Sequence, residues 1–144
     1  MVYMDTSMLV PLFINEPHSL AVGDWYEREK GELVAAAWCV TEFASALCLK
    51  QRTGAIDARL ADAAWVRFER LVAVDLRLLP VDPAYFQRAA ELVLDAASGL
   101  RSGDALHLAC AEAVGAKHMA TLDDVLRRNA QRLKIKPVVL RNKS

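Results

Sequence analysis

The first residues of the chain place a carboxylate and two hydroxyl groups directly after a short apolar run. Asp5, Thr6 and Ser7 follow Met1-Val2-Tyr3-Met4, and apolar residues resume at Met8. This pattern predicts a buried strand that stops before Asp5 and a helix that begins at once, with Thr6 or Ser7 as its N-cap. If the strand belongs to a parallel sheet, its carboxyl end faces the crevice where ligands bind. Asp5 is then placed for catalysis or metal binding.

Three further acidic residues are expected at the same edge of such a sheet. Glu42 lies in an otherwise apolar helical segment, Asp104 in the first turn of a predicted helix, and Asp123 after a predicted strand. Solvation or the helix dipole explains each acid taken alone. A cluster of them would repel unless a cation sat between the carboxylates. Oxygen ligands without nearby cysteines or paired histidines favour Mg²⁺ or Mn²⁺, ions that typically act on phosphates.

The segments that must position these acids alternate between strand and helix patterns. Strands are expected at residues 1–4, 33–36, 76–81, 117–121 and 137–140. Helices are expected at residues 8–15, 17–30, 38–53, 57–74, 82–97, 104–114 and 123–132, with Ser102 or Gly103 as the cap of the sixth. This order predicts an α/β fold in which a parallel sheet of four to five strands is flanked by about seven helices.

Composition indicates one domain that spans residues 1–144. The chain has 144 residues, 54% of them hydrophobic, and a mean hydropathy of +0.15, which suits a large core and leaves room for an apolar surface that binds a partner. No uncharged apolar stretch approaches the roughly 18–20 residues of a membrane span, and no signal peptide is evident. We therefore expect a cytoplasmic protein whose three cysteines, Cys39, Cys48 and Cys110, are buried free thiols.

Charge is balanced overall but divided along the chain. From Lys117 onward there are eight basic and two acidic residues, whereas the preceding part carries ten basic and sixteen acidic residues. A solvated helix face and tail explain this division, and so does a basic end that holds a polyanion near a carboxylate site.

Three sequence blocks resemble PIN-domain ribonucleases, specifically the VapC toxins of VapBC-type toxin–antitoxin pairs. The blocks are Met4-Asp5-Thr6-Ser7, Asp104-Ala105-Leu106-His107-Leu108-Ala109 and Ala120-Thr121-Leu122-Asp123, and Thr41-Glu42 supplies the fourth acid at the expected interval. The match spans nearly the whole chain. The resemblance implies a PIN-like three-layer α/β/α fold.

The resemblance also implies the site and its chemistry. Asp5, Asp104 and Asp123 would bind Mg²⁺ or Mn²⁺, with Glu42 binding directly or through water. The hydroxyls of Thr6, Ser7 and Thr121 would orient these carboxylates or a bound water. The implied reaction is endonucleolytic hydrolysis of RNA by a metal-activated water, leaving a 5′-phosphate. Asp124 could replace or assist Asp123, and we interpret His107 as a packing and hydrogen-bonding residue.

Partners are likewise implied by the resemblance. We expect a cognate VapB-like antitoxin that covers the site, an RNA substrate, and a homodimer that becomes a heterotetramer or a larger assembly with the antitoxin. Arg101, Arg127 and Arg128 are candidates for phosphate contacts. The aromatic residues that could line an apolar groove, or simply pack in the core, are Trp25, Tyr26, Trp38 and Trp65.

Other functions are possible for an acid that follows a first strand. A HAD-like phosphatase needs a second Asp two residues later, where this chain has Ser7, and a receiver domain needs paired acids that Asp5-Thr6 does not supply. A catalytically silent PIN-like module that binds RNA or protein would be expected to have lost one or more of the four acids, and all four are present.

Overall fold

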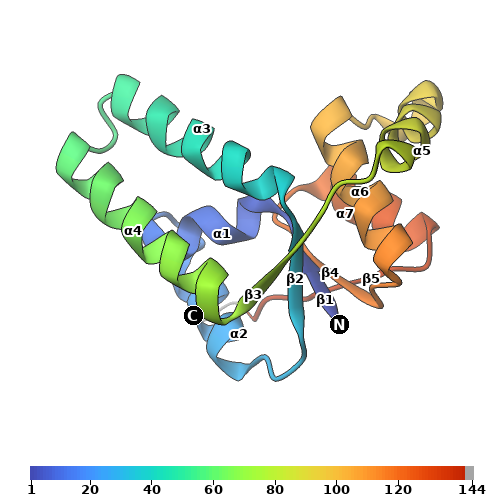
Figure 1. Ribbon diagram of the computed structural model, residues 1–144. Helices are drawn as coiled ribbons and strands as arrows, with labels where there is room; N and C mark the ends of the chain where they lie inside the picture. Colours follow the sequence, from blue (N-terminus) through green and yellow to red (C-terminus); the bar gives the residue numbers. More distant parts are fainter. Residues whose placement is uncertain (142–144) are drawn as a thin grey trace.

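A five-stranded parallel sheet forms the centre of the molecule (Figure 1). This computed structural model describes residues 1–141. The spatial order of the strands is β3-β2-β1-β4-β5. Their bounds are β1 Val2–Met4, β2 Leu33–Ala36, β3 Leu76–Leu79, β4 His118–Ala120 and β5 Lys136–Pro137. The two strands β1 and β2 are buried along their whole length, which explains why they are continuous apolar runs rather than alternating patterns.

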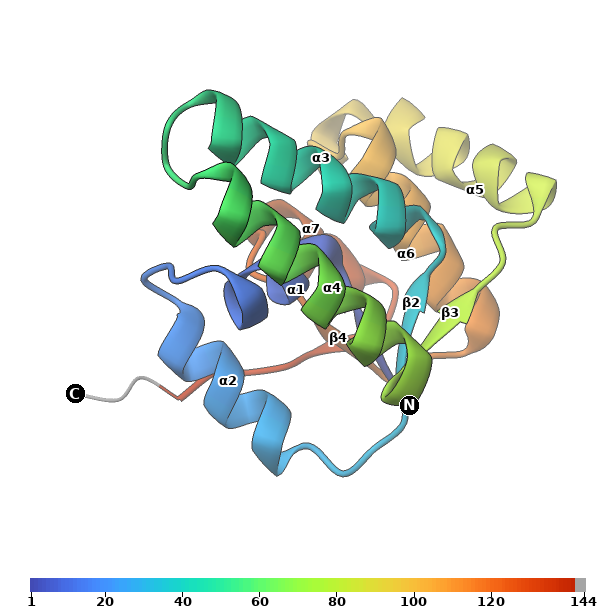
Figure 2. The ribbon, with the colours of Figure 1, turned by 60° about the vertical axis from the view of Figure 1, so that its left-hand side comes forward.

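Helices cover both faces of the sheet (Figures 1 and 2). One layer contains α1 Thr6–Phe13, α2 Ser19–Arg28, α3 Trp38–Arg52 and α4 Ala58–Val74; the other contains α5 Pro83–Leu94, α6 Ser102–Val114 and α7 Asp124–Arg132, with a 3₁₀ turn at Ala96–Ser98. Because successive strand side chains point to opposite faces, Val2 and Met4 join the core beneath the first layer and Tyr3 joins the second. The expected three-layer α/β/α fold is confirmed.

The connection between the strands creates a switch point beside β1. The chain builds the sheet outward from β1 through β2 to β3, then returns to place β4 against the other side of β1. The backbone N–H of Asp5 donates to the carbonyl of Ala120 at 3.2 Å, so the ends of β1 and β4 lie together. In open parallel sheets, the crevice at such a point is where ligands bind. The residues that follow β1 and β4 are therefore the ones best placed for function.

An aromatic cluster anchors α3 and α4 against α1. The rings of Phe43 and Phe68 stack with centroids 4.1 Å apart, and Phe13 of α1 meets both rings edge-on. Phe43 is fully buried, so it fixes the rotation of α3 about its own axis. Glu42, its neighbour, is held partly buried at the start of the helix rather than turned into the core.

Several expected element ends differ from the structure. The third strand ends at Leu79 rather than at 81 because the next residue is Pro80, which has no N–H to donate to a ladder. The last strand spans Lys136–Pro137 instead of residues 137–140, and the backbone N–H of Val138 still donates to the carbonyl of Met119 at 2.8 Å. The fourth strand spans His118–Ala120, one residue shorter at each end than expected.

The starts of three helices also differ from the expected ones. The first helix starts at Thr6 rather than at Met8, with Asp5 in the N-cap position, so neither Thr6 nor Ser7 is its N-cap. The second starts at Ser19, not Pro17. The cap residue of α6 is Arg101, which makes no side-chain capping bond, and Ser102 lies inside the helix.

The apolar stripe expected to face inward on α5 is largely exposed. Ala89 is buried, whereas Phe86 is 56% exposed and Val93 is 36% exposed. Together with Trp38, Leu94 and Leu106 these residues line an apolar groove of about 490 Å³ between α5, α6 and the start of α3. Of the other aromatic candidates, Trp25 is a core residue and Trp65 packs against Phe43 and Phe68.

The three cysteines form no disulfide. Cys39 and Cys110 are buried free thiols as expected, but Cys48 is exposed, which corrects the expectation for that residue. Burial raises the pKa of Cys39 to about 12, so this thiol stays protonated and unreactive. Within residues 1–141, the longest apolar helices fall short of what a membrane crossing requires.

Candidate active site

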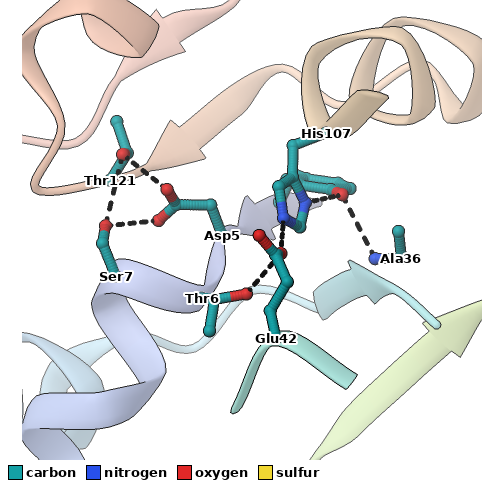
Figure 3. A network of polar contacts seen from close by, with 8 residues as sticks. Asp5, Thr6, Ser7, Ala36, Glu42, His107 and Thr121 are labelled. Atoms are coloured by element: carbon teal, nitrogen blue, oxygen red, sulfur yellow. Dashed lines mark hydrogen bonds and ion pairs between the residues drawn. The ribbon is translucent and has the colours of Figure 1, made fainter. Parts of the chain in front are cut away.

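Asp5 lies at the end of β1 with both carboxylate oxygens bound by hydroxyl groups (Figure 3). Its side chain is buried, Ser7 Oγ donates to Oδ1 at 2.6 Å, and Thr121 Oγ1 donates to Oδ2 at 2.9 Å. Burial raises the pKa of Asp5 to about 6, and the nearby charge of Asp104 acts in the same direction. The charge of His107 and the hydrogen bonds from the two hydroxyls lower the pKa and limit that rise.

The same two hydroxyls join the loops that follow β1 and β4. Ser7 Oγ accepts the backbone N–H of Leu122 at 2.8 Å, and Thr121 Oγ1 accepts that of Asp123 at 3.0 Å. Since each hydroxyl accepts from the backbone, its own proton is directed to Asp5. The carboxylate is therefore held in one orientation by two hydroxyl groups that are 114 residues apart in the sequence.

Glu42 receives hydrogen bonds from two other elements. Thr6 Oγ1 donates to Glu42 Oε1 at 2.8 Å, and His107 Nε2 contacts the same oxygen. Burial alone would raise the pKa of Glu42, but the bonds and charge of His107 and the bond from Thr6 hold it below its usual range. Thr6 thus orients Glu42, while Ser7 and Thr121 orient Asp5.

His107 is connected to the sheet through Tyr3, a contact that sequence reasoning missed. The Tyr3 hydroxyl lies 2.7 Å from His107 Nδ1 and accepts the backbone N–H of Ala36 at 3.2 Å (Figure 3). Burial raises the pKa of Tyr3 well above its ordinary value, so its hydroxyl keeps its proton. The one available signal was a tyrosine in an otherwise apolar strand, because a buried hydroxyl needs a partner.

Asp104 lies in α6 and Asp123 directly before α7, two helices of the other layer. Together with Asp5 and Glu42 they form what we call the acidic edge of the sheet. Burial raises the pKa of Asp104, and the charges of Asp123 and Glu42 add to the effect, which places these carboxylates within electrostatic reach of one another. Asp123 also caps α7, its Oδ1 accepting from the backbone N–H of Leu126 at 2.8 Å. The neighbouring Asp124 side chain is 86% exposed and pairs with Arg127, so Asp123 is the better-placed candidate.

The donors at this edge fit a hard divalent cation by their chemistry. The four candidate groups are carboxylates, and each of the three aspartates directly follows a strand or begins a helix at one sheet edge. In the arrangement observed, no three acidic, histidine or cysteine side chains within residues 1–141 are gathered closely enough to hold a metal ion. The metal site stays a prediction.

The three arginines proposed to contact phosphate have different surroundings. Arg127 Nη2 donates to the carbonyl of Thr121 at 3.1 Å, so it supports the loop that carries Asp123. Arg101 is exposed at the start of α6, where its charge lowers the pKa of Asp104 against the stronger effect of burial. Arg128 is exposed on α7.

Comparisons with known proteins agree with this architecture. The PIN domain family model matches residues 2–131. Three solved structures share the fold: Mycobacterium tuberculosis VapC20, described as a sarcin–ricin loop cleaving toxin, PAE2754 from Pyrobaculum aerophilum, and FitAcB from Neisseria gonorrhoeae.

Sequence identity to these structures is low, while coverage is high. VapC20 is 17% identical with a TM-score of 0.74, over 95% of this chain and 100% of that one. PAE2754 is 20% identical with a TM-score of 0.66, over 94% and 82%, and FitAcB is 17% identical with a TM-score of 0.72, over 95% and 96%. The sequence matches none of the curated proteins. The family match, which covers most of the chain, confirms the resemblance drawn from the three sequence blocks: the chain belongs to the PIN domain family.

Proposed function

We propose that this chain is a metal-dependent endoribonuclease that serves as the toxin of a toxin–antitoxin pair. The observation that carries the proposal is the buried Asp5 carboxylate, bound by Ser7 and Thr121 at the switch point of a PIN fold and electrostatically coupled to Asp104. Burying a carboxylate costs free energy that hydrogen bonds offset only in part, and a strongly perturbed pKa is typical of a functional site.

The residues that would hold Mg²⁺ or Mn²⁺ are Asp5, Asp104 and Asp123, with Glu42 acting directly or through water. When bound, the ion supplies an activated water and neutralises charge that develops on the phosphate. The protein's own side chains orient the carboxylates. Ser7 and Thr121 fix the Asp5 oxygens, and Thr6 with His107 fixes one Glu42 oxygen, so these two groups need little reorganisation when substrate arrives.

Two features support the RNA and protein partners. Arg101 and Arg128 lie exposed on helices that begin at the acidic edge, where they would contact RNA phosphates. The apolar groove that contains Trp38 and Phe86 begins beside Gly103, next to Asp104, and offers an antitoxin segment or a second copy a place to bind near the site.

The test is cleavage of total RNA, and of an oligonucleotide with the sarcin–ricin loop, by purified protein with Mn²⁺ or Mg²⁺. We expect new 5′-phosphate ends with metal, none with EDTA, and loss of at least about 100-fold in rate for Asp5→Asn. Asp62→Asn on the exposed face of α4 is the matched control and should cleave normally. Undiminished cleavage by Asp5→Asn would contradict the proposed site, and RNA binding without cleavage would favour the silent module.

A second pair of variants assigns the fourth carboxylate. We expect Asp123→Asn to lose cleavage and Asp124→Asn to retain it, because Asp124 points into solvent and pairs with Arg127. Retention of cleavage by Asp123→Asn together with its loss in Asp124→Asn would transfer the role to Asp124.

A further inference from the structure

The two oxygens of Glu42 have different surroundings. Oε1 takes both the Thr6 hydroxyl and His107 Nε2. Oε2 lies at the first turn of α6, where a Cβ placed on Gly103 would be 3.6 Å from it and 3.7 Å from Trp38 Nε1. Oε1 is therefore held by Thr6 and His107, while Oε2 faces the turn that carries Asp104 and lies beside Trp38, whose side chain also hydrogen-bonds Glu42.

The hydrogen bond between Glu42 and His107 has only one possible direction. A carboxylate offers acceptors alone, so the proton between Glu42 and His107 must sit on Nε2. On the other side of the ring, the Tyr3 hydroxyl accepts the N–H of Ala36 and lies 2.7 Å from His107 Nδ1, so it holds the second ring nitrogen. The contacts thus form one sequence, from Ala36 N–H through Tyr3 and His107 to Glu42 (Figure 3).

This sequence of contacts is rigid because it is buried and complete. Tyr3 is 0% exposed and His107 is 1% exposed, and the Tyr3 ring meets the imidazole edge-on at 5.8 Å between centroids. Within residues 1–141, no buried side-chain nitrogen or oxygen lacks a hydrogen-bond partner. A fully satisfied buried network defines the position of its members more sharply than apolar packing does.

We propose that His107, oriented by Tyr3, is a positioning residue that holds Oε1 of Glu42 and so directs Oε2 toward the cation site at the start of α6. This inference rests on the proposed function and goes beyond it, because it assigns a role to two residues that are not carboxylates. It also explains why His107 lies one turn after Asp104: the spacing places both on one face of α6, with the aspartate at the site and the imidazole behind it.

The experiment compares His107→Leu with His107→Gln in the full-length chain. Leu fills similar space without an N–H donor, whereas the amide of Gln can donate to Glu42 in place of Nε2. We expect His107→Leu to bind Mn²⁺ at least about tenfold more weakly by isothermal titration calorimetry, and His107→Gln to recover most of the affinity. Tyr3→Phe should produce a smaller loss, since His107 then keeps its bond to Glu42 but loses the contact at Nδ1 that orients its ring.

A double-mutant cycle separates positioning from packing. If His107 acts through Glu42, then His107→Leu should cause no further loss of Mn²⁺ affinity in a Glu42→Gln background. His118→Gln, a histidine at the opposite end of β4, serves as the matched control and should bind Mn²⁺ normally. Thermal unfolding of each variant establishes that the fold persists.

Each outcome bears on one of the two proposals. Equal Mn²⁺ affinity of His107→Leu and the unaltered chain would overturn the positioning role, and so would equal losses in the Leu and Gln variants. Additive losses in the cycle would show that His107 acts by packing alone, which also overturns it. If the unaltered chain neither binds Mn²⁺ nor cleaves RNA, the proposed function itself is wrong, and the inference that rests on it falls too.

Discussion

At the scale of single residues, the site is defined by hydroxyl groups as much as by carboxylates. The four candidate acids and the three hydroxyls could be named from the sequence because three short blocks, together with Thr41-Glu42, carry them. Their pairing could not, since Thr6 serves Glu42 while Ser7 and Thr121 serve Asp5. Tyr3 escaped notice because its partner His107 lies 104 residues away, and nothing local in the sequence relates the two.

The raised pKa of Asp5 predicts that this residue destabilises the metal-free protein at neutral pH. The folded pKa of about 6 exceeds the ordinary 3.8, so the native state holds more protons than the unfolded state between these values. Stability in EDTA should therefore fall as pH rises from 4 to 6, by up to about 3 kcal/mol for this one group. Urea denaturation across that range measures it.

Asp5→Asn is the matching variant for that measurement. The amide carries no charge, so we expect the pH-dependent loss between 4 and 6 to shrink and the metal-free variant to be more stable at pH 7. Adding Mn²⁺ should stabilise the unaltered chain but not this variant. A variant that is less stable than the unaltered chain at pH 7 would mean that the hydrogen bonds from Ser7 and Thr121 outweigh the cost of burying the charge.

Thr121→Val tests the hydroxyl directly. Valine keeps the shape but removes the donor to Asp5 and the acceptor for the N–H of Asp123. We expect a loss of about 1–3 kcal/mol in stability and a slower cleavage rate. Thr53→Val, at the exposed end of α3, is the control and should change neither by a measurable amount.

At the scale of elements, the order of strands and helices was predicted correctly from the sequence, and the sheet is parallel as expected. Element ends were less certain, because one of them is set by Pro80 and one by the use of Thr6 and Ser7 in tertiary bonds. The inward face assigned to α5 was wrong for a different reason. Its apolar stripe resembles that of a core helix, but α6 covers only part of it, and Phe86 remains exposed.

Substitution of two phenylalanines, one buried and one exposed, should show how the loss of stability depends on burial of the ring. Phe43→Ala removes one ring of the stacked pair between α3 and α4, and we expect it to cost about 3–5 kcal/mol. Phe86→Ala on α5 should cost far less, because the ring is already 56% exposed. Chemical denaturation of both variants measures the difference. Equal costs would show that the groove on α5 is covered in solution.

At the scale of the whole molecule, charge and apolar surface are distributed unevenly. The basic C-terminal part, which begins at Lys117, includes β4, α7 and β5, so Arg127 and Arg128 lie on a helix that begins at the acidic edge rather than in a detached tail. Composition could indicate such a division, but its place relative to the site depended on the position of β4 next to β1. The apolar groove was indicated only in general terms by the high hydrophobic fraction.

This arrangement predicts that RNA affinity falls as the salt concentration rises, and that exposed arginines of α7 contribute to this dependence. We expect Arg128→Gln to reduce affinity similarly for different single-stranded RNA sequences and to lower the salt slope by about 0.7, as one phosphate contact does. Arg70→Gln is the control, because the end of α4 lies at the opposite edge of the sheet, before β3. Fluorescence anisotropy at several salt concentrations gives both slopes. An unchanged slope for Arg128→Gln would remove this residue from the interface.

The position of β4 beside β1 also governs when the molecule can become active. Asp5 is synthesised before the hydroxyl that binds its second oxygen and before the acid that follows β4, both of which come more than a hundred residues later in the chain. An unfinished chain therefore has a first carboxylate without the partners that complete its site. Synthesis itself thus delays activity, and a protein proposed to cut RNA is inert until the segment that carries Thr121 and Asp123 has been translated.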